Sequence, residues 1–226
     1  MTYSLTMRAM LLASALALAP AAWAETPADT LVVAHTIDDI ISLDPAVSFE
    51  FAGNDVNNNT YDRLVDFNPL DPDAGFQPSL ATEWAVSEDG LSITFTLRVD
   101  ATFHSGNPVR AADAAWSLQR AVKLDKTPAF ILTQFGFTAD NVDQMITADG
   151  NTLTLTMDKP YAPTFVLNCL TANIASVVDM ETVMANEVDG DMGNAWLNTN
   201  EAGSGAYVLS AWRPNEAVQL TAYEEY

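Results

Sequence analysis

The residues that could carry catalytic chemistry are few and widely spaced. A serine hydrolase needs an exposed serine beside a histidine and an acid. Ser204 lies in a small-residue stretch, Ala202-Gly203-Ser204-Gly205-Ala206, but this stretch lacks the G-x-S-x-G spacing of a nucleophile elbow. The two histidines, His35 and His104, stand in no recognisable catalytic motif. The sequence therefore favours a protein that is not an enzyme, with a secreted hydrolase as the alternative of a different class.

The candidate metal ligands are also incomplete. His35 with Asp38-Asp39, and Asp189-Gly190-Asp191 near Asn194, each lack a full ligand set. The second group has no bidentate acid to close an EF-hand loop, so a turn with solvated carboxylates is expected there. Glycine-rich phosphate loops and dinucleotide fingerprints are absent from the sequence. These patterns predict neither a metal site nor a cofactor.

The charge balance excludes one class of partner. The 226 residues carry 9 Lys and Arg against 30 Asp and Glu, which gives a formal net charge of −21. Such a surface repels the phosphates of nucleic acids and anionic lipids. With 49% hydrophobic residues and no low-complexity tract, the chain is expected to fold into one or two globular cores with a solvated acidic surface. No nucleic-acid partner is expected.

The first 24 residues have the layout of a secretory signal peptide. Arg8 precedes an apolar run at 9–19, and the small-residue site Ala22-Trp23-Ala24 follows. We therefore expect residues 1–24 to be removed and the mature chain to begin at Glu25. The single cysteine, Cys169, lies far from this site, so neither a lipid-modified N-terminal cysteine nor an internal disulfide is expected. The predicted location is the periplasm.

The elements that would position these residues are strands and helices without strict βαβ alternation. The clearest pattern is a β-hairpin, in which segments 83–87 and 91–98 flank Glu88-Asp89-Gly90 and apolar residues alternate with polar ones. The other expected elements are a buried strand at 31–35, a helix within 53–64, an amphipathic helix at 110–123, a second strand pair at 142–148 and 152–157, helices at 162–170 and 178–187, and strands at 207–212 and 217–222. The fold class is α/β with mixed sheets.

Several ordered segments together resemble one family. They are Ser42-Leu43-Asp44-Pro45, Tyr61-Asp62-Arg63-Leu64-Val65, the stretch LATEWAVSEDGL at 80–91, TFTLR at 94–98, FHSG at 103–106, Ala112-Asp113 through SLQR at 117–120, GSGAYVL at 203–209 and the terminal 223–226. This series resembles the family 5 bacterial extracellular solute-binding proteins, which include binders of dipeptides, oligopeptides and nickel complexes. The family commonly has GTGP where this chain reads Gly203-Ser204-Gly205-Ala206.

The resemblance implies a fold, a function and partners. Family members are two-lobed clamps of the type II periplasmic-binding-protein fold, which enclose a ligand by a hinge motion. They run to about twice this length, so the resemblance implies that residues 25–226 form the N-terminal lobe and that the second lobe is missing from this sequence. The implied function is to capture a small peptide as a monomer and deliver it to an inner-membrane ABC permease with its ATPase. Opines, sugars or metal chelates as ligands, and a sensor or scaffold lobe without transport, are the alternatives.

The same resemblance indicates candidate ligand-binding residues. The loop after Asp44-Pro45, which reads Phe49-Glu50-Phe51-Ala52, would run beside the ligand and offer two aromatic side chains and backbone hydrogen bonds. Phe135 and the stretch Thr171-Ala172-Asn173 would lie at the cleft edge. The alternative for Phe49 and Phe51 is that both fill a core. His104 is expected to make structural hydrogen bonds.

Overall fold

A computed structural model describes residues 26–68, 70, 71, 73 and 75–226. The expected signal peptide and its cleavage point at Glu25 lie outside the described residues. Residues 26–35 form one part of the described chain, and Thr36–Tyr226 form a separate compact unit that contains all the helices and strands below. Among the described residues, none of the helices combines the length and apolar character needed to cross a bilayer.

The largest sheet has four strands in the order β3-β4-β6-β5. Its strands are β3 (Ala81–Val86), β4 (Ser92–Leu97), β5 (Ile146–Asp149) and β6 (Thr152–Thr156), and every pair in this sheet is antiparallel. The hairpin predicted around Asp89-Gly90 is therefore confirmed as β3–β4. Gly90 has φ +70°, a conformation that glycine adopts without the steric cost of a side chain.

One face of this sheet forms the main core. In β4, Ile93, Phe95 and Leu97 are buried, while Thr94 faces the other way and its hydroxyl lies 3.3 Å from that of Thr154 on β6. This is the period-2 alternation read from the sequence. The buried set fixes the register, because a slip of one residue would turn the apolar side chains to the opposite face.

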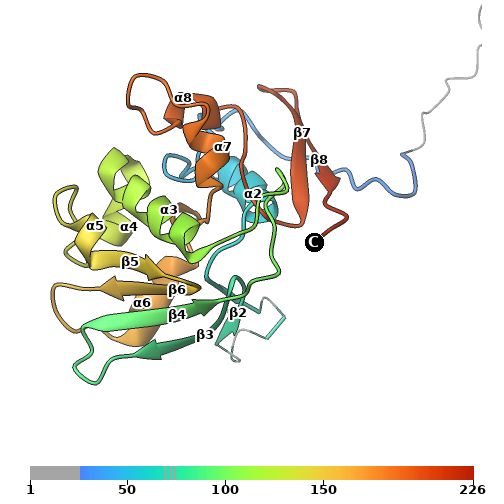
Figure 1. The fold of residues 1–226 in the computed structure, drawn as a ribbon. Coiled ribbons are helices and arrows are strands. Elements are labelled where there is room, and N and C mark those ends of the chain that lie inside the picture. The colour runs from blue at the N-terminus through green and yellow to red at the C-terminus, as the bar shows by residue number, and fades with distance from the viewer. Residues whose placement is uncertain (1–25, 69, 72, 74) are drawn as a thin grey trace, which may run out of the picture. The chain divides into compact units, whose positions relative to one another are not determined.

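The long helix α3 (Ala111–Leu124) covers the apolar face of the sheet and contacts β5 and β6 (Figure 1). Its first turn is held by Asp113, whose carboxylate accepts a hydrogen bond of 2.9 Å from the backbone N–H of Arg110. Ala114, Leu118 and several other residues of the helix are buried. The amphipathic helix predicted at 110–123 is thus confirmed.

Several shorter helical segments follow α3 along the chain. They are η3 (Thr127–Ala129), α4 (Phe130–Thr133), α5 (Val142–Met145), α6 (Pro163–Leu170), η4 (Asn173–Ala175), α7 (Met180–Met184) and α8 (Asn194–Leu197). The helix expected at 162–170 is confirmed as α6. The helix expected at 178–187 is shorter, because the side chain of Asp179 accepts a hydrogen bond from the backbone N–H of Thr182 and so caps the start of α7.

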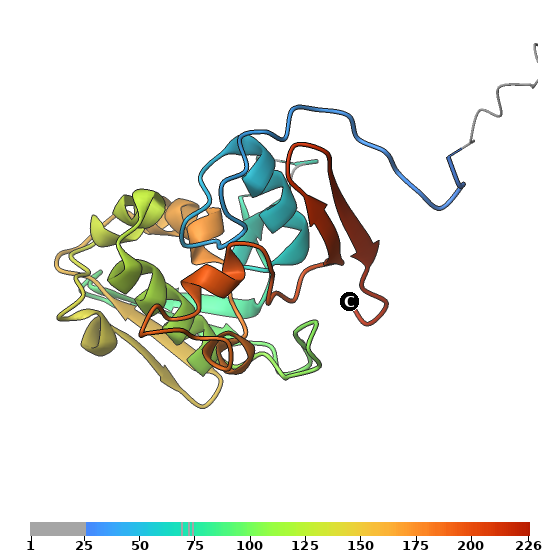
Figure 2. The same cartoon turned by 90° about the horizontal axis from the view of Figure 1, so that it is seen from above.

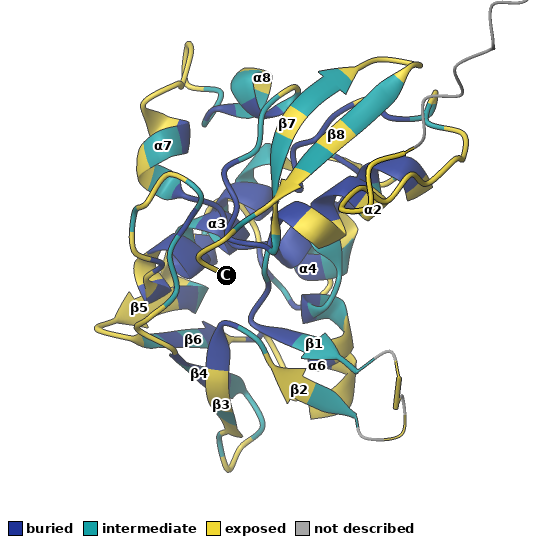
Figure 3. Cartoon of the chain, turned by 90° about the vertical axis from the view of Figure 1, so that its right-hand side faces the viewer, coloured by how far each residue is buried: buried dark blue, intermediate teal, exposed yellow. Residues whose placement is uncertain are grey.

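Helix α2 (Phe51–Thr60) lies beside a separate two-stranded ribbon of β7 (Tyr207–Arg213) and β8 (Ala217–Ala222) (Figure 2). A small apolar cluster that includes Val56 of α2 joins them, and Leu209 of the ribbon packs against it. The ribbon is half-buried or exposed along its length, whereas α3 is largely buried (Figure 3). A second ribbon, β1 (Val65–Phe67) paired with β2 (Phe76–Pro78), is also antiparallel.

The strand expected at 31–35 is wrong, and the strand expected at 142–148 is confirmed only in its second half, as β5. Residues 31–35 form no strand, and Leu31, Val32 and Val33 are exposed rather than buried. An apolar run becomes a strand only when a neighbouring backbone pairs with it, and no such pairing is present for these residues. The first half of the segment expected at 142–148 is the helical turn α5, because the Asn141 side chain accepts a hydrogen bond from Thr138 N–H and starts a turn.

The α/β class itself is confirmed, and within the described part of the chain the strand pairs are all antiparallel. Tight backbone contact joins the end of α2 to the segment that leads into β7. A Cβ on Gly203 would clash with the carbonyl oxygen of Thr60, and Gly205 N–H donates to that oxygen at 3.0 Å. Glycine is therefore required at 203 for close approach, whatever residue follows at 206.

Candidate functional site

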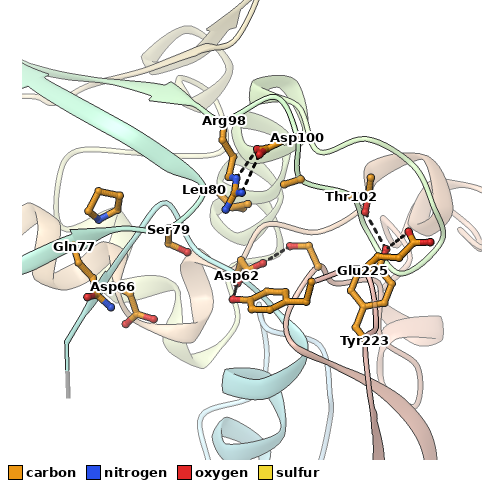
Figure 4. Close-up of a pocket in the computed structure, with 14 residues that line it drawn as sticks. Asp62, Asp66, Gln77, Ser79, Leu80, Arg98, Asp100, Thr102, Tyr223 and Glu225 are labelled. Carbon is orange, nitrogen blue, oxygen red and sulfur yellow. Dashed lines mark hydrogen bonds and ion pairs between the residues drawn. The ribbon is translucent and has the colours of Figure 1, made fainter. Parts of the chain in front are cut away.

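Two hollows on the unit formed by Thr36–Tyr226 are candidates for a binding site. The larger, about 270 Å³, lies near the end of the chain and contains several charged side chains (Figure 4). Asp62 accepts hydrogen bonds from the hydroxyls of Ser204 at 2.9 Å and Tyr226 at 3.2 Å, and Arg98 donates to both oxygens of Asp100. Burial raises the pKa of Asp62, and the two hydrogen bonds oppose this shift. These polar groups are already paired with one another, so this hollow is the weaker candidate for capturing a solute.

The smaller hollow, about 240 Å³, is the candidate site because it brings together residues that the sequence places far apart. It is lined by Ser48, Phe49, Asn54, Asn58, Pro128, Ile131, Thr171, Ala172, Asn173 and Ile174. Four of these residues, from Ser48 to Asn58, belong to α2 and the loop before it. Pro128 and Ile131 belong to η3 and α4, and residues 171–174 run from the end of α6 into η4. None of these lining residues, all of them described, carries a charge.

Phe49 forms the apolar side of this hollow. Its side chain is 49% exposed and meets the ring of Phe130 edge to face at 5.9 Å between centroids. The carboxylate of Glu50 accepts a hydrogen bond of 3.0 Å from the backbone N–H of Phe49 and lies 3.5 Å from the Ser48 hydroxyl. Glu50 is thus directed at the backbone before α2 and does not line the hollow. This hydrogen bond holds the backbone at Phe49 in place just before α2 begins.

The structure divides the sequence-predicted site residues into two groups. Phe49 and all of Thr171-Ala172-Asn173 line the hollow. Phe51 is 91% exposed at the first position of α2, and Ala52 is buried in the cluster beneath the helix. Phe135 is 1% exposed and belongs to the main core, where it meets the ring of Tyr161 at 5.0 Å.

The sequence analysis missed several lining residues. Asn54 and Asn58 come from α2 and are one helical turn apart, so they present neighbouring side chains on one face. The i, i+4 spacing of two asparagines was the available signal. Pro128 and Ile131 lie in η3 and α4, at least 68 positions beyond the end of α2 at Thr60, and no local pattern connects the two segments.

A buried ion pair holds the loop that leads to Phe49. Asp44 and Arg120 of α3 have side chains that are 0% and 1% exposed, and the guanidinium donates to both carboxylate oxygens at 2.9 and 2.6 Å. Asp44 also accepts from the amide of Asn194 at 2.7 Å and from Ala46 N–H at 2.9 Å. A fully paired carboxylate of this kind fixes the loop against α3.

His104 ties together two loops at a distance from the hollow. Its Nδ1 lies 2.8 Å from a carboxylate oxygen of Glu201, and its Nε2 lies 2.9 Å from the carbonyl oxygen of Gly205. Burial lowers the pKa of His104, but the hydrogen bond and charge of Glu201, with smaller contributions from Gly205 and Asp62, outweigh burial and leave the pKa raised. Both ring nitrogens are occupied, in agreement with the structural role expected from the sequence.

The fold matches solved substrate-binding proteins, and comparison with known proteins identifies the family. Residues 75–226 match the family described as bacterial extracellular solute-binding proteins, family 5 Middle. The probable D,D-dipeptide-binding periplasmic protein DdpA of Escherichia coli K12 is 32% identical over 100% of this chain and 42% of its own length. This chain belongs to the family 5 bacterial extracellular solute-binding proteins.

Solved structures agree with that assignment. The murein tripeptide binding protein MppA of Escherichia coli superposes with a TM-score of 0.69 at 30% identity, over 84% of this chain and 37% of that one. The periplasmic binding protein DppA of Helicobacter pylori, solved with the peptide STSA, gives a TM-score of 0.62 at 26% identity, over 82% of this chain and 37% of that one. The chain therefore spans about two fifths of the length of these relatives.

Proposed function

We propose that this chain is part of the substrate-binding component of an ABC importer, which captures di- or oligopeptides in the periplasm and delivers them to an inner-membrane permease with its ATPase. The observation that carries the proposal is the hollow that unites Phe49 with Thr171-Ala172-Asn173 in a family 5 fold. Peptides are favoured over other solutes because the names of DdpA and MppA, and the peptide solved with the Helicobacter protein, refer to peptides.

The hollow would act as one wall of a two-walled site. Its volume, about 240 Å³, is small for a whole peptide. Ligand sites usually occupy about 300–1,000 Å³ and bury most of the ligand surface. We infer that residues 25–226 form the first lobe of a monomeric clamp, and that a second lobe closes over the ligand. Residues 1–24 would direct export and be removed.

Within this wall, the candidate residues would have different roles. Phe49 would supply apolar contact, and Thr171, Ala172 and Asn173 would line the opposite edge. Glu50 would position the Phe49 backbone through its 3.0 Å hydrogen bond.

The direct test is mass spectrometry of the solute that copurifies with the full-length protein, followed by incubation with a defined peptide pool. A binding protein retains intact peptides, whereas a secreted hydrolase would consume them. Recovery of an opine, a sugar or a metal chelate in place of a peptide would refute the peptide proposal and retain the transport class. Cleavage of the pool would refute both.

A pair of neighbouring phenylalanines tests the location of the site. Phe49→Ala is expected to weaken binding of the recovered peptide by about tenfold, since it removes an aromatic contact surface. Phe51→Ala is the matched control, because Phe51 lies two residues away, is more exposed and does not line the hollow. Equal loss in both variants would contradict the assignment of the hollow as the binding wall.

A further inference from the structure

The polar side of the hollow is built from three asparagine side chains, two of which accept hydrogen bonds from one buried cation. Asn54 and Asn58 come from α2, and Asn173 opens η4. Behind them lies Arg63, whose side chain is 7% exposed and whose Nη2 lies 3.3 Å from Asp66. The guanidinium does not line the hollow, so it acts on a solute only through the amides in front of it.

Arg63 fixes which way these amides point. Its Nη1 donates to Oδ1 of Asn58 at 3.1 Å and to Oδ1 of Asn173 at 2.9 Å. A guanidinium has donors and no acceptor, so each of these amides must present its oxygen to Arg63. The amide nitrogen of Asn173 then faces α2, where it donates to Oδ1 of Asn54 at 3.0 Å and to the Asn54 carbonyl at 3.2 Å.

The consequence is an outward-facing set of donors. The side-chain oxygens of Asn54 and Asn58 each already accept one hydrogen bond, whereas their amide nitrogens donate none in the part of the chain that the structure describes. Within the described residues, neither nitrogen has a hydrogen-bond partner, and both residues line the hollow. The two residues are one helical turn apart, so their side chains lie on the same face of α2.

The other side of the hollow is apolar. Phe49 packs edge to face with Phe130, which is 57% exposed, and Pro128 and Ile131 continue this side. A bound carboxylate or carbonyl would meet donors without a competing side-chain anion among the lining residues. A bound ammonium would find no anion among the lining residues and only amide oxygens that already accept a hydrogen bond on Asn54 and Asn58, so desolvating it would be costly.

We propose that this wall receives a hydrogen-bond acceptor of the solute, a carboxylate or carbonyl group, through the amide nitrogens of Asn54 and Asn58, with an adjacent apolar group against Phe49 and Phe130. Arg63 is the positioning residue that sets the amide orientation. The inference rests on the proposed solute-binding function and specifies which part of the solute meets this lobe.

The test uses Asn58→Asp in the full-length protein, with Asn59→Asp as its matched control. Asn58→Asp keeps an oxygen for Arg63 but replaces the outward N–H₂ by a second acceptor oxygen. Asn59→Asp introduces the same charge in the same helix, at an exposed residue outside the hollow whose amide donates to the Asp55 carbonyl. The probes are the dipeptide Ala-Phe, benzoylglycine as a non-peptide acceptor with an aromatic group, and phenethylammonium as an aromatic cation without an acceptor. Affinities are measured by calorimetry.

We expect Asn58→Asp to weaken binding of Ala-Phe and benzoylglycine by at least about tenfold, and Asn59→Asp to change it by less than about twofold. Phenethylammonium should bind detectably to neither variant nor wild type. If benzoylglycine binds with this pattern and Ala-Phe does not, the peptide function fails and the inference stands. If Ala-Phe binds and both variants respond alike, the function stands and the inference is overturned. Failure of both acceptor probes, or preferred binding of the cation, also overturns it.

Arg63→Lys tests the positioning role separately. Lysine keeps the positive charge but cannot match the planar fork of a guanidinium. We expect weaker binding of Ala-Phe, with an unchanged ratio between the affinities for Ala-Phe and Ala-Ala, because that ratio reports the contact with Phe49 and Phe130. A collapse of the ratio would indicate general disruption of the site, and unchanged Ala-Phe affinity would show that Arg63 does not orient the amides. Either result contradicts the positioning role.

Discussion

The buried ion pair of Asp44 and Arg120 allows a prediction about stability whose size follows from the structure. Arg120→Met removes the guanidinium and keeps a long apolar side chain. The Asp44 carboxylate then loses contacts of 2.9 and 2.6 Å but keeps two donors, Asn194 and the Ala46 N–H. Removing one partner of a buried ion pair typically costs about 3–5 kcal/mol. Because two donors remain, we expect Arg120→Met to lower the free energy of unfolding by about 3 kcal/mol.

The opposite change should cost more. Asp44→Asn turns one of the two acceptor oxygens into an N–H₂ group that faces the guanidinium of Arg120. Apart from the remaining side-chain oxygen at position 44, Arg120 then has one hydrogen-bond acceptor, the Met192 carbonyl oxygen at 2.8 Å from Nε. A buried cation with so few acceptors is costly, and we expect a loss of about 4–5 kcal/mol in the free energy of unfolding. The double variant contains no buried charge at this position, so its loss should fall short of the sum by about 2 kcal/mol or more.

The assay is urea denaturation of the full-length protein followed by tryptophan fluorescence, to which Trp116 contributes a local signal because its ring lies 5.8 Å from the Arg120 guanidinium carbon. Arg98→Met is the control, since the Arg98–Asp100 pair is exposed and should contribute less than about 1 kcal/mol. The reasoning is refuted if Arg120→Met is as mild as this control, or if it destabilises the protein more than Asp44→Asn.

Three further outcomes are expected. Because the pKa of His104 is raised in the folded state, the stability it gains from Glu201 is fully present below its ordinary pKa of 6.5 and is lost as pH rises through the folded pKa. The difference in unfolding free energy between wild type and His104→Gln, measured from about pH 5.5 to 8.5, should therefore shrink with rising pH, and a difference that grows would contradict the assigned partner. Gly203→Ala should destabilise the protein by about 1–3 kcal/mol in a thermal or urea melt, because its Cβ meets the Thr60 carbonyl, and an unchanged melt would show that the backbone adjusts freely. N-terminal sequencing of periplasmic protein should begin at Glu25, and an intact Met1 would disprove cleavage.

Local patterns predicted the elements whose structure depends on neighbouring residues in the chain. The β3–β4 hairpin follows from alternation around a tight turn at Gly90, and α3 follows from its apolar spacing and from Asp113 in the first turn. The strand expected at 31–35 depended on a distant pairing partner, which no local pattern can report. The same limit applies to Phe135, whose burial comes from packing with Tyr161 and other distant residues.

The candidate site was predicted in part because a resemblance carries tertiary information that spacing does not. Phe49 and the segment 171–173 were proposed together, and the structure brings them to one hollow across more than 120 positions. The role of Arg63 could not be found in this way. Its contact with Asn173 spans 110 positions, and the sequence shows only an ordinary basic residue in a segment typical of the family.

Phe49 and Phe51 show why residue type alone could not complete the assignment. Both are phenylalanines in one short segment, and contact with the ligand was predicted for each, with a place in the core as the alternative. The chain is extended at Glu50, with φ −81° and ψ 154°, and becomes helical at Phe51. This change of backbone direction sends Phe49 toward Phe130 and leaves Phe51 exposed on the first turn of α2. The position of the helix start therefore decides which aromatic ring lines the hollow, and neither ring fills the core.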